Sequence, residues 1–291
     1  MRIQVCSQVS IPATGQTLPD WQPLRNAGHA VVVSNNLLPV EPPDVIIGMG
    51  VGVMEHTFNA TDLYLDVPFF AYNWDCYEWV WKNPRPGEYD YNRYGELLKR
   101  AKEIWVPSDC TGKRTTQWWE LTNWETVCCS VPYWDHPNVR DSGYALCCLR
   151  EIPDPYWGRF EKACTELGIP YRMTAHGLRY EQYQDSVAHC RFICSPLYEL
   201  STGGLSTLEA FYLGKPVILS NSPWHGGRDY FREKATYFNH ESEEDFRRVL
   251  QAVYDNPESY VPRDHKEFIT ENFSDEVTCR NILKRIEYHL S

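Results

Sequence analysis

The sequence predicts an α/β protein built from two Rossmann-like, doubly wound domains that face each other across a cleft. Short apolar runs alternate with amphipathic helical patterns almost from end to end, which is typical of parallel sheets made of βα units. The alternation stops at residues 132–143, "PYWDHPNVRDSG", a stretch of turn formers, and then starts again. The chain has 291 residues, 43% of them apolar, and can therefore fill two hydrophobic cores.

The first half alternates strands and helices and ends in a helix. A glycine closes the first predicted helix, at Gly28, and further glycines follow the third strand. The expected strands cover residues 2–9, 29–34, 43–50 and 67–75; a helix covers 20–28, a helix followed by a strand covers 94–108, and another helix covers 110–123.

The second half repeats the pattern and closes with two amphipathic helices. Its expected strands cover residues 144–151, 169–175, 191–196 and 216–220; its helices cover 157–168, 179–190, a segment that begins at 204, 242–255 and 277–290. We therefore predict domains at 1–135 and 144–275, with a last helix at 276–291 that packs back on the first domain. In such sheets, ligands bind beyond the carboxyl ends of the strands.

Composition excludes several classes of function. The formal net charge of −11 disfavours a broad grip on nucleic acid or on an anionic membrane. The first ten residues lack the apolar core of a signal peptide, and no run approaches the ~18 apolar residues of a membrane span, so we expect a cytoplasmic protein. Eleven cysteines without a CxxC pair favour reduced thiols in the core.

Residues 200–220, "LSTGGLSTLEAFYLGKPVILS", carry the most informative local pattern. A helix that begins at Gly204-Leu205 presents unpaired N–H groups to an anion, and Gly203 and Gly204 let a phosphate approach the backbone. Glu209, one turn into the helix, can accept hydrogen bonds from ribose hydroxyls. Phosphate and ribose together indicate a nucleotide, although a short glycine motif alone is equally compatible with a plain turn.

The wider segment "SPLYELSTGGLSTLEAFYLGKPVILS" resembles the donor-site signature of retaining GT-B glycosyltransferases of the GT4 family. The stretches "AKEIWVPSDCTGKRTTQW" and "YRMTAHGLRYEQYQDSVAHCRFICSP" and the closing segment from Tyr237 onward also resemble this family. The resemblance covers most of the chain from about residue 95. It is specific only near 195–220, and the first 90 residues match in outline alone.

The resemblance implies roles for residues on the donor side. Glu209 would bind the donor ribose, and the N–H groups of Gly204, Leu205 and Ser206 would bind the diphosphate. The acid that contacts the donor sugar is Glu199 or, by counting back from Glu209, the position of Ser201. We prefer Glu199 because a carboxylate accepts from two hydroxyls at once.

The same resemblance assigns a diphosphate cation and a nucleoside contact. Arg150 stands where the family places a basic residue that neutralises the diphosphate. The family's second cation, a lysine, is absent, and Arg159 or Lys162 are the possible substitutes, whereas Lys215 lies in a turn and is expected to be structural. His176 would lie near the nucleoside or be a plain loop residue.

The acceptor side is expected in the first domain, where residues 68–91 are dense in aromatic side chains. Many of these must be core residues, and Trp74, Tyr77 and Trp79 are candidates for a platform under a sugar ring or a base. Family members carry a His or Asp in this loop near the reacting carbon. Asn73 and Asp75 are the matching positions, and Asp75 is the preferred catalytic candidate.

The resemblance implies transfer of a hexose, with glucose from a UDP-sugar the first expectation, to a hydroxyl acceptor with retention of configuration. No cofactor or metal is expected, since helix N–H groups and Arg150 would stabilise the leaving diphosphate and the chain has no Asp-x-Asp motif. The acceptor, a glycan, a small molecule or a modified DNA base, and the oligomeric state stay open. Alternatives are a phage-type DNA glycosyltransferase, a non-catalytic nucleotide-sugar-binding protein and a nucleotide-sugar epimerase.

Overall fold

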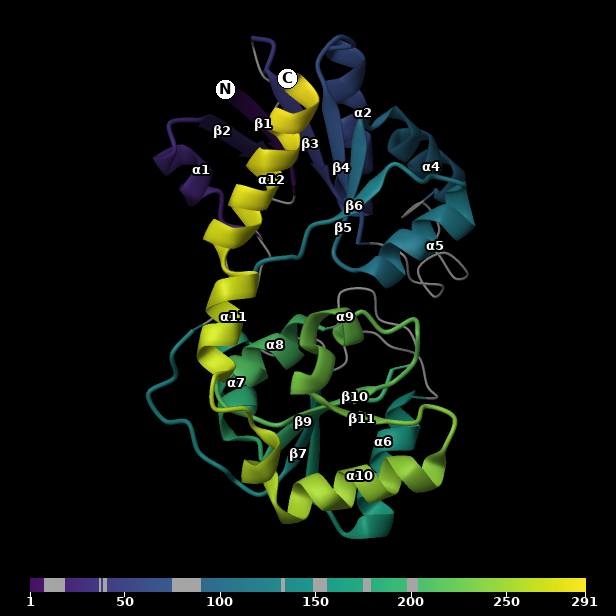
Figure 1. Cartoon of the computed structure of the whole chain (residues 1–291), viewed down its shortest axis with the longest axis vertical. Helices are drawn as coiled ribbons and strands as arrows, with labels where there is room; N and C mark the ends of the chain where they lie inside the picture. The colour runs from purple at the N-terminus through teal and green to yellow at the C-terminus, as the bar shows by residue number, and fades with distance from the viewer. Residues whose placement is uncertain are drawn as a thin grey trace. The chain divides into compact units, whose positions relative to one another are not determined.

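The computed structural model of the chain describes residues 1–7, 19–36, 38, 41–74, 90–131, 134–148, 156–174, 179–197 and 204–291. It divides the chain into two compact units (Figure 1). The first unit contains Met1–Ser130 and Asp275–Ser291, and the second contains Val131–Ser274. The helix at the end of the chain therefore belongs to the first unit, and the turn-rich segment 132–143 is assigned to the second unit.

The first unit is built on a six-stranded parallel sheet with the strand order β2-β1-β3-β4-β5-β6. Its strands are β1 (Arg2–Cys6), β2 (Ala30–Ser34), β3 (Val45–Met49), β4 (Phe69–Tyr72), β5 (Glu103–Val106) and β6 (Trp124–Thr126). Its helices are α1 (Gln22–Asn26), η1 (Val51–Val53), α2 (Met54–Leu63), α4 (Tyr91–Arg100), α5 (Asp109–Trp119) and α12 (Asp275–Leu290). The three-residue edge strand β6 was not predicted, because "WET" is too short to show a strand pattern.

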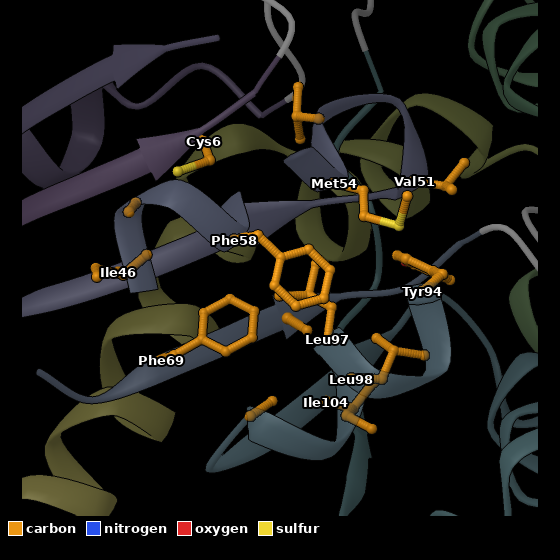
Figure 2. Close-up of a cluster of buried hydrophobic side chains, with 14 of the residues drawn as sticks. Cys6, Ile46, Val51, Met54, Phe58, Phe69, Tyr94, Leu97, Leu98 and Ile104 are labelled. Carbon is orange, nitrogen blue, oxygen red and sulfur yellow. The ribbon is translucent and has the colours of Figure 1, made fainter. Parts of the chain in front are cut away.

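One face of this sheet buries a contiguous apolar cluster under α2 and α4 (Figure 2). Phe58 from α2 and Leu98 from α4 meet Ile46, Phe69 and residues of neighbouring strands there, and all of these side chains are buried. Gly48 on β3 is required for the close approach of α2, because an added Cβ would lie 2.7 Å from Thr57 Cγ2. The inner strands β1, β3, β4 and β5 are buried on both faces, which is why they appear in the sequence as largely apolar runs.

Helix α2 was missed from the sequence because several of its buried positions are polar. Thr57 and Thr61 are buried and satisfy their hydroxyls within the helix, where Thr57 Oγ1 donates to the Val53 carbonyl at 2.9 Å and Thr61 Oγ1 to the Phe58 carbonyl at 3.0 Å. A helix that buries polar residues in this way gives no clear apolar period in the sequence.

Helix α12 is fastened to the first unit at both of its ends. Near its start, Thr278 Oγ1 donates to the Cys128 carbonyl at 3.0 Å. Near its end, Arg285 forms a two-point ion pair with the buried carboxylate of Glu103, which His289 and the Trp105 indole also contact, at 3.2 and 2.9 Å. The helix is therefore part of the first unit's packing.

The second unit is built on a five-stranded parallel sheet with the strand order β11-β10-β9-β7-β8. Its strands are β7 (Ala145–Cys148), β8 (Tyr171–Thr174), β9 (Phe192–Ser195), β10 (Val217–Ser220) and β11 (Thr236–Phe238). Its helices are α6 (Tyr156–Leu167), α7 (Tyr180–His189), α8 (Leu205–Tyr212), α9 (Gly227–Phe231), η2 (Arg232–Lys234), α10 (Glu243–Asp255), η3 (Pro257–Tyr260) and α11 (His265–Phe273).

The segment between the two sheets is hydrogen-bonded to the second unit. The amide of Arg140 donates to the Ala188 carbonyl at 3.2 Å, and the amide of Ser142 donates to the His189 carbonyl at 3.0 Å. This segment therefore lies along the end of α7. Among the described helices, none has the length and apolar character needed to cross a membrane.

Candidate functional site

The order of strands in the second unit reverses between β7 and β9. From β7 the chain passes through α6 to β8 on one side, and then through α7 to β9 on the other side of β7. The two connections leave β7 and β9 in opposite directions, so their carboxyl ends border the crevice where ligands bind in doubly wound sheets. Helix α8 follows β9 and begins at this edge of the sheet.

The start of α8 has the geometry that the sequence predicted for an anion site. Gly204 precedes the helix with φ 78° and ψ 103°, a left-handed φ that residues other than glycine rarely adopt. Its carbonyl accepts from the amide and the hydroxyl of Thr207, at 3.0 and 2.6 Å. The amides of Leu205 and Ser206 precede that bond and have no acceptor within an α-helix, so they are available to an anion.

Glu209 lies one turn behind these amides and is only 5% exposed. The hydroxyl of Tyr183, on α7, donates a hydrogen bond to its Oε2 atom. Tyr183 in turn stacks on Tyr180, with ring centroids 6.0 Å apart and planes inclined by 22°. Glu209 is therefore not a solvated helix residue, because its carboxylate is buried and is oriented by a neighbouring helix.

Three of the described side chains beside this carboxylate are neutral. Burial, and then the charge of Glu209, raise the pKa of Tyr183 well above its usual value and that of Tyr180 to about 12. The Cys148 thiol, at the end of β7, lies beside the hydroxyls of Thr174 and Ser206, and burial raises its pKa to about 12. Cys148 is therefore a neutral thiol at physiological pH and is not a nucleophile in this state.

A buried histidine lies at the same edge of the sheet after β10, and no local pattern in the sequence predicted it. His225 is 1% exposed, and its Nδ1 accepts from the Gly227 amide at 3.1 Å, so its Nε2–H donates to Ser195 Oγ, 3.1 Å away. Burial lowers the pKa of His225 to about 3, so the ring stays neutral. The ring fixes the 221–226 segment against the end of β9 and offers no lone pair to a proton donor.

The two cations proposed as substitutes for the absent lysine have other partners. Arg159 pairs with Glu243 at 2.7 Å and donates to the His240 carbonyl at 2.9 Å. Lys162 lies 3.9 Å from Glu166 and its side chain is 71% exposed. Helix α6 thus positions Arg159 against the β11 to α10 connection, where it already has a carboxylate partner, and Lys162 on the surface. A role for either residue at a diphosphate stays a prediction.

Lys215 is structural, as the sequence indicated. It is 5% exposed, and its Nζ donates to the Arg140 carbonyl at 2.7 Å. Burial lowers its pKa. Several other predicted site residues lie outside the described residues: Asp75, Tyr77, Trp79, Arg150, His176, Glu199, Ser201 and Gly203.

On the first unit, Asn73 is buried and has a structural role. It is 0% exposed at the end of β4, where its Nδ2 donates to Thr115 Oγ1 at 3.0 Å and its Oδ1 accepts from the Tyr94 hydroxyl at 3.1 Å. Its proposed place beside a reacting carbon is therefore wrong. Trp74, a residue of the predicted platform, is half-buried, and its ring packs against Tyr72 with the ring centroids 5.3 Å apart.

The first unit also has a histidine at its carboxyl edge that sequence reasoning missed. Strand order reverses between β1 and β3, and β3 leads through Gly50 into α2. His56, in the first turn of α2, is 8% exposed, and its Nε2 has no hydrogen-bond partner among the described residues. Burial lowers its pKa. The glycine-rich run "GMGVG", residues 48–52, follows a buried strand and was the one local pattern that could have indicated a site at this edge.

Comparisons with known proteins bear on the fold alone. The chain matches no family model and no curated protein sequence. Its structure is similar to a sucrose-phosphate synthase from Thermosynechococcus elongatus, with a TM-score of 0.68 and 12% identity over 100% of both chains. It is also similar to Anabaena HepE, solved with UDP and glucose, with a TM-score of 0.65 and 11% identity over 99% of this chain and 100% of that chain.

Two further structures extend this similarity. The lipopolysaccharide outer core galactosyltransferase WaaB, in its apo form, has a TM-score of 0.64 and 13% identity over 99% of this chain and 100% of that chain. A candidate UDP-N-acetylglucosamine 2-epimerase from Listeria monocytogenes has a TM-score of 0.56 and 12% identity over 99% and 96% of the two chains. The predicted fold class is confirmed: the chain has the α/β GT-B fold, with two parallel sheets covered by helices.

Proposed function

We propose that this protein is a glycosyltransferase that binds a nucleotide-diphosphate sugar in its second unit and moves a hexose to a hydroxyl acceptor. The observation that supports this most directly is Glu209, buried and oriented by Tyr183 one turn behind the glycine-led start of α8. A phosphate at the amides of Leu205 and Ser206 leaves the attached ribose within reach of this carboxylate. The fold neighbours that were solved with UDP and glucose, or that are galactosyltransferases, support the same assignment.

The finer parts of the proposal are a UDP-sugar, glucose as the hexose, and retention of anomeric configuration, as the GT4 resemblance implies. In this mechanism Glu199 binds the sugar hydroxyls, Arg150 and the helix amides stabilise the leaving diphosphate, and His176 contacts the nucleoside. Asp75 is the candidate on the acceptor side, with Trp74, Tyr77 and Trp79 as the platform. No metal takes part in the transfer.

The first experiment is a thermal-shift and calorimetric screen against UDP-, GDP-, ADP- and TDP-sugars. One binder is expected to raise the unfolding midpoint saturably, because a ligand that binds only the folded state stabilises it. NMR of the product formed with mixed glycan, small-molecule and hydroxymethylated DNA acceptors then identifies the acceptor and the anomeric configuration. Binding to none of these donors contradicts the proposal, and an inverted product contradicts the retaining mechanism.

The competing activity is epimerisation of the sugar, which the similarity to the Listeria protein favours. The two reactions give different products from the same donor. An epimerase changes the NMR spectrum of the nucleotide sugar with no acceptor present, whereas a transferase releases the nucleoside diphosphate when the acceptor is added. A binding protein without turnover does neither, although it gives the same thermal shift.

A further inference from the structure

We propose that His136, Asp185 and His189 form a zinc site that fastens the 134–138 segment to the end of helix α7. Each of the three side chains offers one ligand atom, and these atoms lie within 4.8 Å of one another. Asp185 and His189 are four residues apart on α7, so both project from one face of the helix. His136 comes from the segment that lies along the end of this helix.

The spacing of the ligand atoms suits a small tetrahedral cation. His136 Nε2 is 3.1 Å from Asp185 Oδ1, close to the ~3.3 Å that separates two tetrahedral ligands whose bonds to zinc are about 2.0–2.1 Å long. The two imidazole rings cross nearly at right angles, at 89°, with centroids 5.4 Å apart. A modest closure of the His189 side chain therefore completes a three-ligand site, and water can supply the fourth ligand.

The hydrogen bond of His189 already favours metal binding. Its Nε2–H lies 2.9 Å from the Asn138 carbonyl oxygen, which accepts this proton. The proton on Nε2 leaves the lone pair on Nδ1 for a metal. Metal-binding histidines commonly donate their other ring N–H to a backbone carbonyl in this way, which fixes the tautomer and the orientation of the ring.

His136 has to change its tautomer when zinc binds. Without metal, its Nδ1 accepts from the Asn138 amide at 3.2 Å, and its Nε2–H donates to Asp185. Zinc on Nε2 moves the ring proton to Nδ1, so this long amide bond is lost. Asn138 is exposed, and water can therefore take over its amide. The alternative is a hydrogen bond between His136 and Asp185 with no metal bound. This alternative has the same contacts, so only an experiment distinguishes it from a zinc site.

The donor set and the position indicate which ion binds and what it does. Two imidazole nitrogens and one carboxylate oxygen favour zinc over magnesium and calcium, which prefer oxygen ligands only. Tyr183, near the start of α7, contacts Glu209, whereas His189 is the last residue of the helix. The zinc site therefore lies at the other end of α7 from the residue that contacts Glu209, and it does not rest on the proposed function.

The test is a titration of Zn²⁺ into the full chain after treatment with a chelator, followed by calorimetry and by the thermal unfolding midpoint. We expect one ion per chain and a saturable rise in the midpoint. The variants His136→Ala and His189→Ala are expected to lose about tenfold or more in zinc affinity, a loss at least as large as that seen when outer partners of metal ligands are changed. Asp185→Asn keeps an oxygen that accepts the hydrogen bond from His136 but loses the negative charge. It should therefore weaken zinc binding and leave the metal-free protein as stable as the wild type.

The matched control is His240→Ala, which removes another histidine of this unit that lies beside a carboxylate, 3.9 Å from Glu241. It should leave zinc affinity unchanged. Co²⁺ replaces zinc as a spectroscopic probe, because thiolate ligands produce a sulfur-to-cobalt charge-transfer band that a site of two histidines and one aspartate lacks. Absence of saturable binding, equal binding by all variants, or a thiolate band from the bound cobalt would each overturn the proposal.

Discussion

Replacement of Glu209 by alanine tests the proposed donor site most directly. In the proposed complex the carboxylate accepts hydrogen bonds from ribose hydroxyls, and a hydrogen bond to a charged group contributes about 1.5–3 kcal/mol. Loss of one such bond raises the dissociation constant by about 10- to 150-fold, since 1.4 kcal/mol corresponds to a factor of ten. We therefore expect Glu209→Ala to weaken binding of the nucleotide sugar by more than tenfold.

The alanine variant also affects stability, so a second variant is needed. The Tyr183 hydroxyl donates to Glu209, and a buried donor that loses its acceptor destabilises the fold by about 1–3 kcal/mol. Glu209→Gln keeps an oxygen that accepts from Tyr183 and removes only the charge. It is expected to unfold close to the wild-type midpoint and still to bind the nucleotide weakly. Glu241→Ala, at an exposed glutamate of the same unit, is the control for a change of one charge.

The assay compares the nucleoside diphosphate with its 2′,3′-dideoxy analogue by calorimetry. The wild-type protein should prefer the ribose form by more than tenfold, and this preference should collapse toward unity in Glu209→Ala. A variant that stays folded and keeps both its affinity and its preference for ribose would refute the role of Glu209. A wild-type protein that binds neither nucleotide would refute the proposed function itself.

Four other predictions, one of them with a matched control variant, test separate parts of the molecule. Tyr183→Phe removes the hydroxyl that orients Glu209 and should reduce the preference for ribose several-fold, as measured with the same pair of nucleotides. Gly204→Ala and Gly143→Ala both place a Cβ at φ 78° and should each cost about 1 kcal/mol of stability, but only the change at Gly204 should weaken diphosphate binding, by calorimetry. Arg150→Ala should lower kcat at least as severely as it weakens donor binding, because leaving-group charge develops in the transition state; an unchanged kcat places the phosphate role elsewhere. Glu103→Gln should destabilise the protein at pH 7 by about 1.5–3 kcal/mol, the contribution of a hydrogen bond to a charged group. The difference from wild type should shrink as the pH falls below about 4, as followed by denaturant unfolding.

The sign of the Glu103 prediction follows from the environment of its carboxylate. Burial opposes ionisation, but hydrogen bonds from Arg285, His289 and Trp105 outweigh it and lower the pKa of Glu103. A carboxylate with a lowered pKa contributes stability that is present above its unfolded value and is lost as the pH falls through the folded value. A pH-independent difference between Glu103→Gln and wild type would mean that shape, and not charge, fastens α12 to β5.

The sequence predicted those parts of the fold whose signal is local. Most strands of the two sheets are short runs with a strand pattern, whereas the three-residue edge strands β6 and β11 were not predicted. Helix α8 is indicated by the glycines before it and by an apolar period within it. Helix α2 was missed because its buried threonines satisfy their own hydroxyls, which removes the apolar period. Segment 132–143 was interpreted as a connection because its hydrogen bonds to α7 leave no mark in its composition.

Only the site residues that belong to one helix, α8, could be predicted together from the sequence. Gly204 and Glu209 lie on the same helix start, so their spacing alone relates them. Tyr183 is separated from Glu209 by 26 residues, and His225 is separated from Ser195 by 30. Such pairs depend on the order of the strands in the sheet, which no local pattern encodes.

The structure also narrows how an acidic protein can hold a diphosphate. The chain has a net charge of −11, and the described side chains beside Glu209 and Ser206 include the neutral groups of Tyr183 and Cys148. Arg159 is paired with Glu243, and Lys215 is buried against a carbonyl. In the proposed complex, the charge of the diphosphate would be met by the amides at the start of α8 and by Arg150. Amides fixed by a helix do not reorganise as charge develops on the leaving group, so this arrangement favours the transition state over the bound substrate.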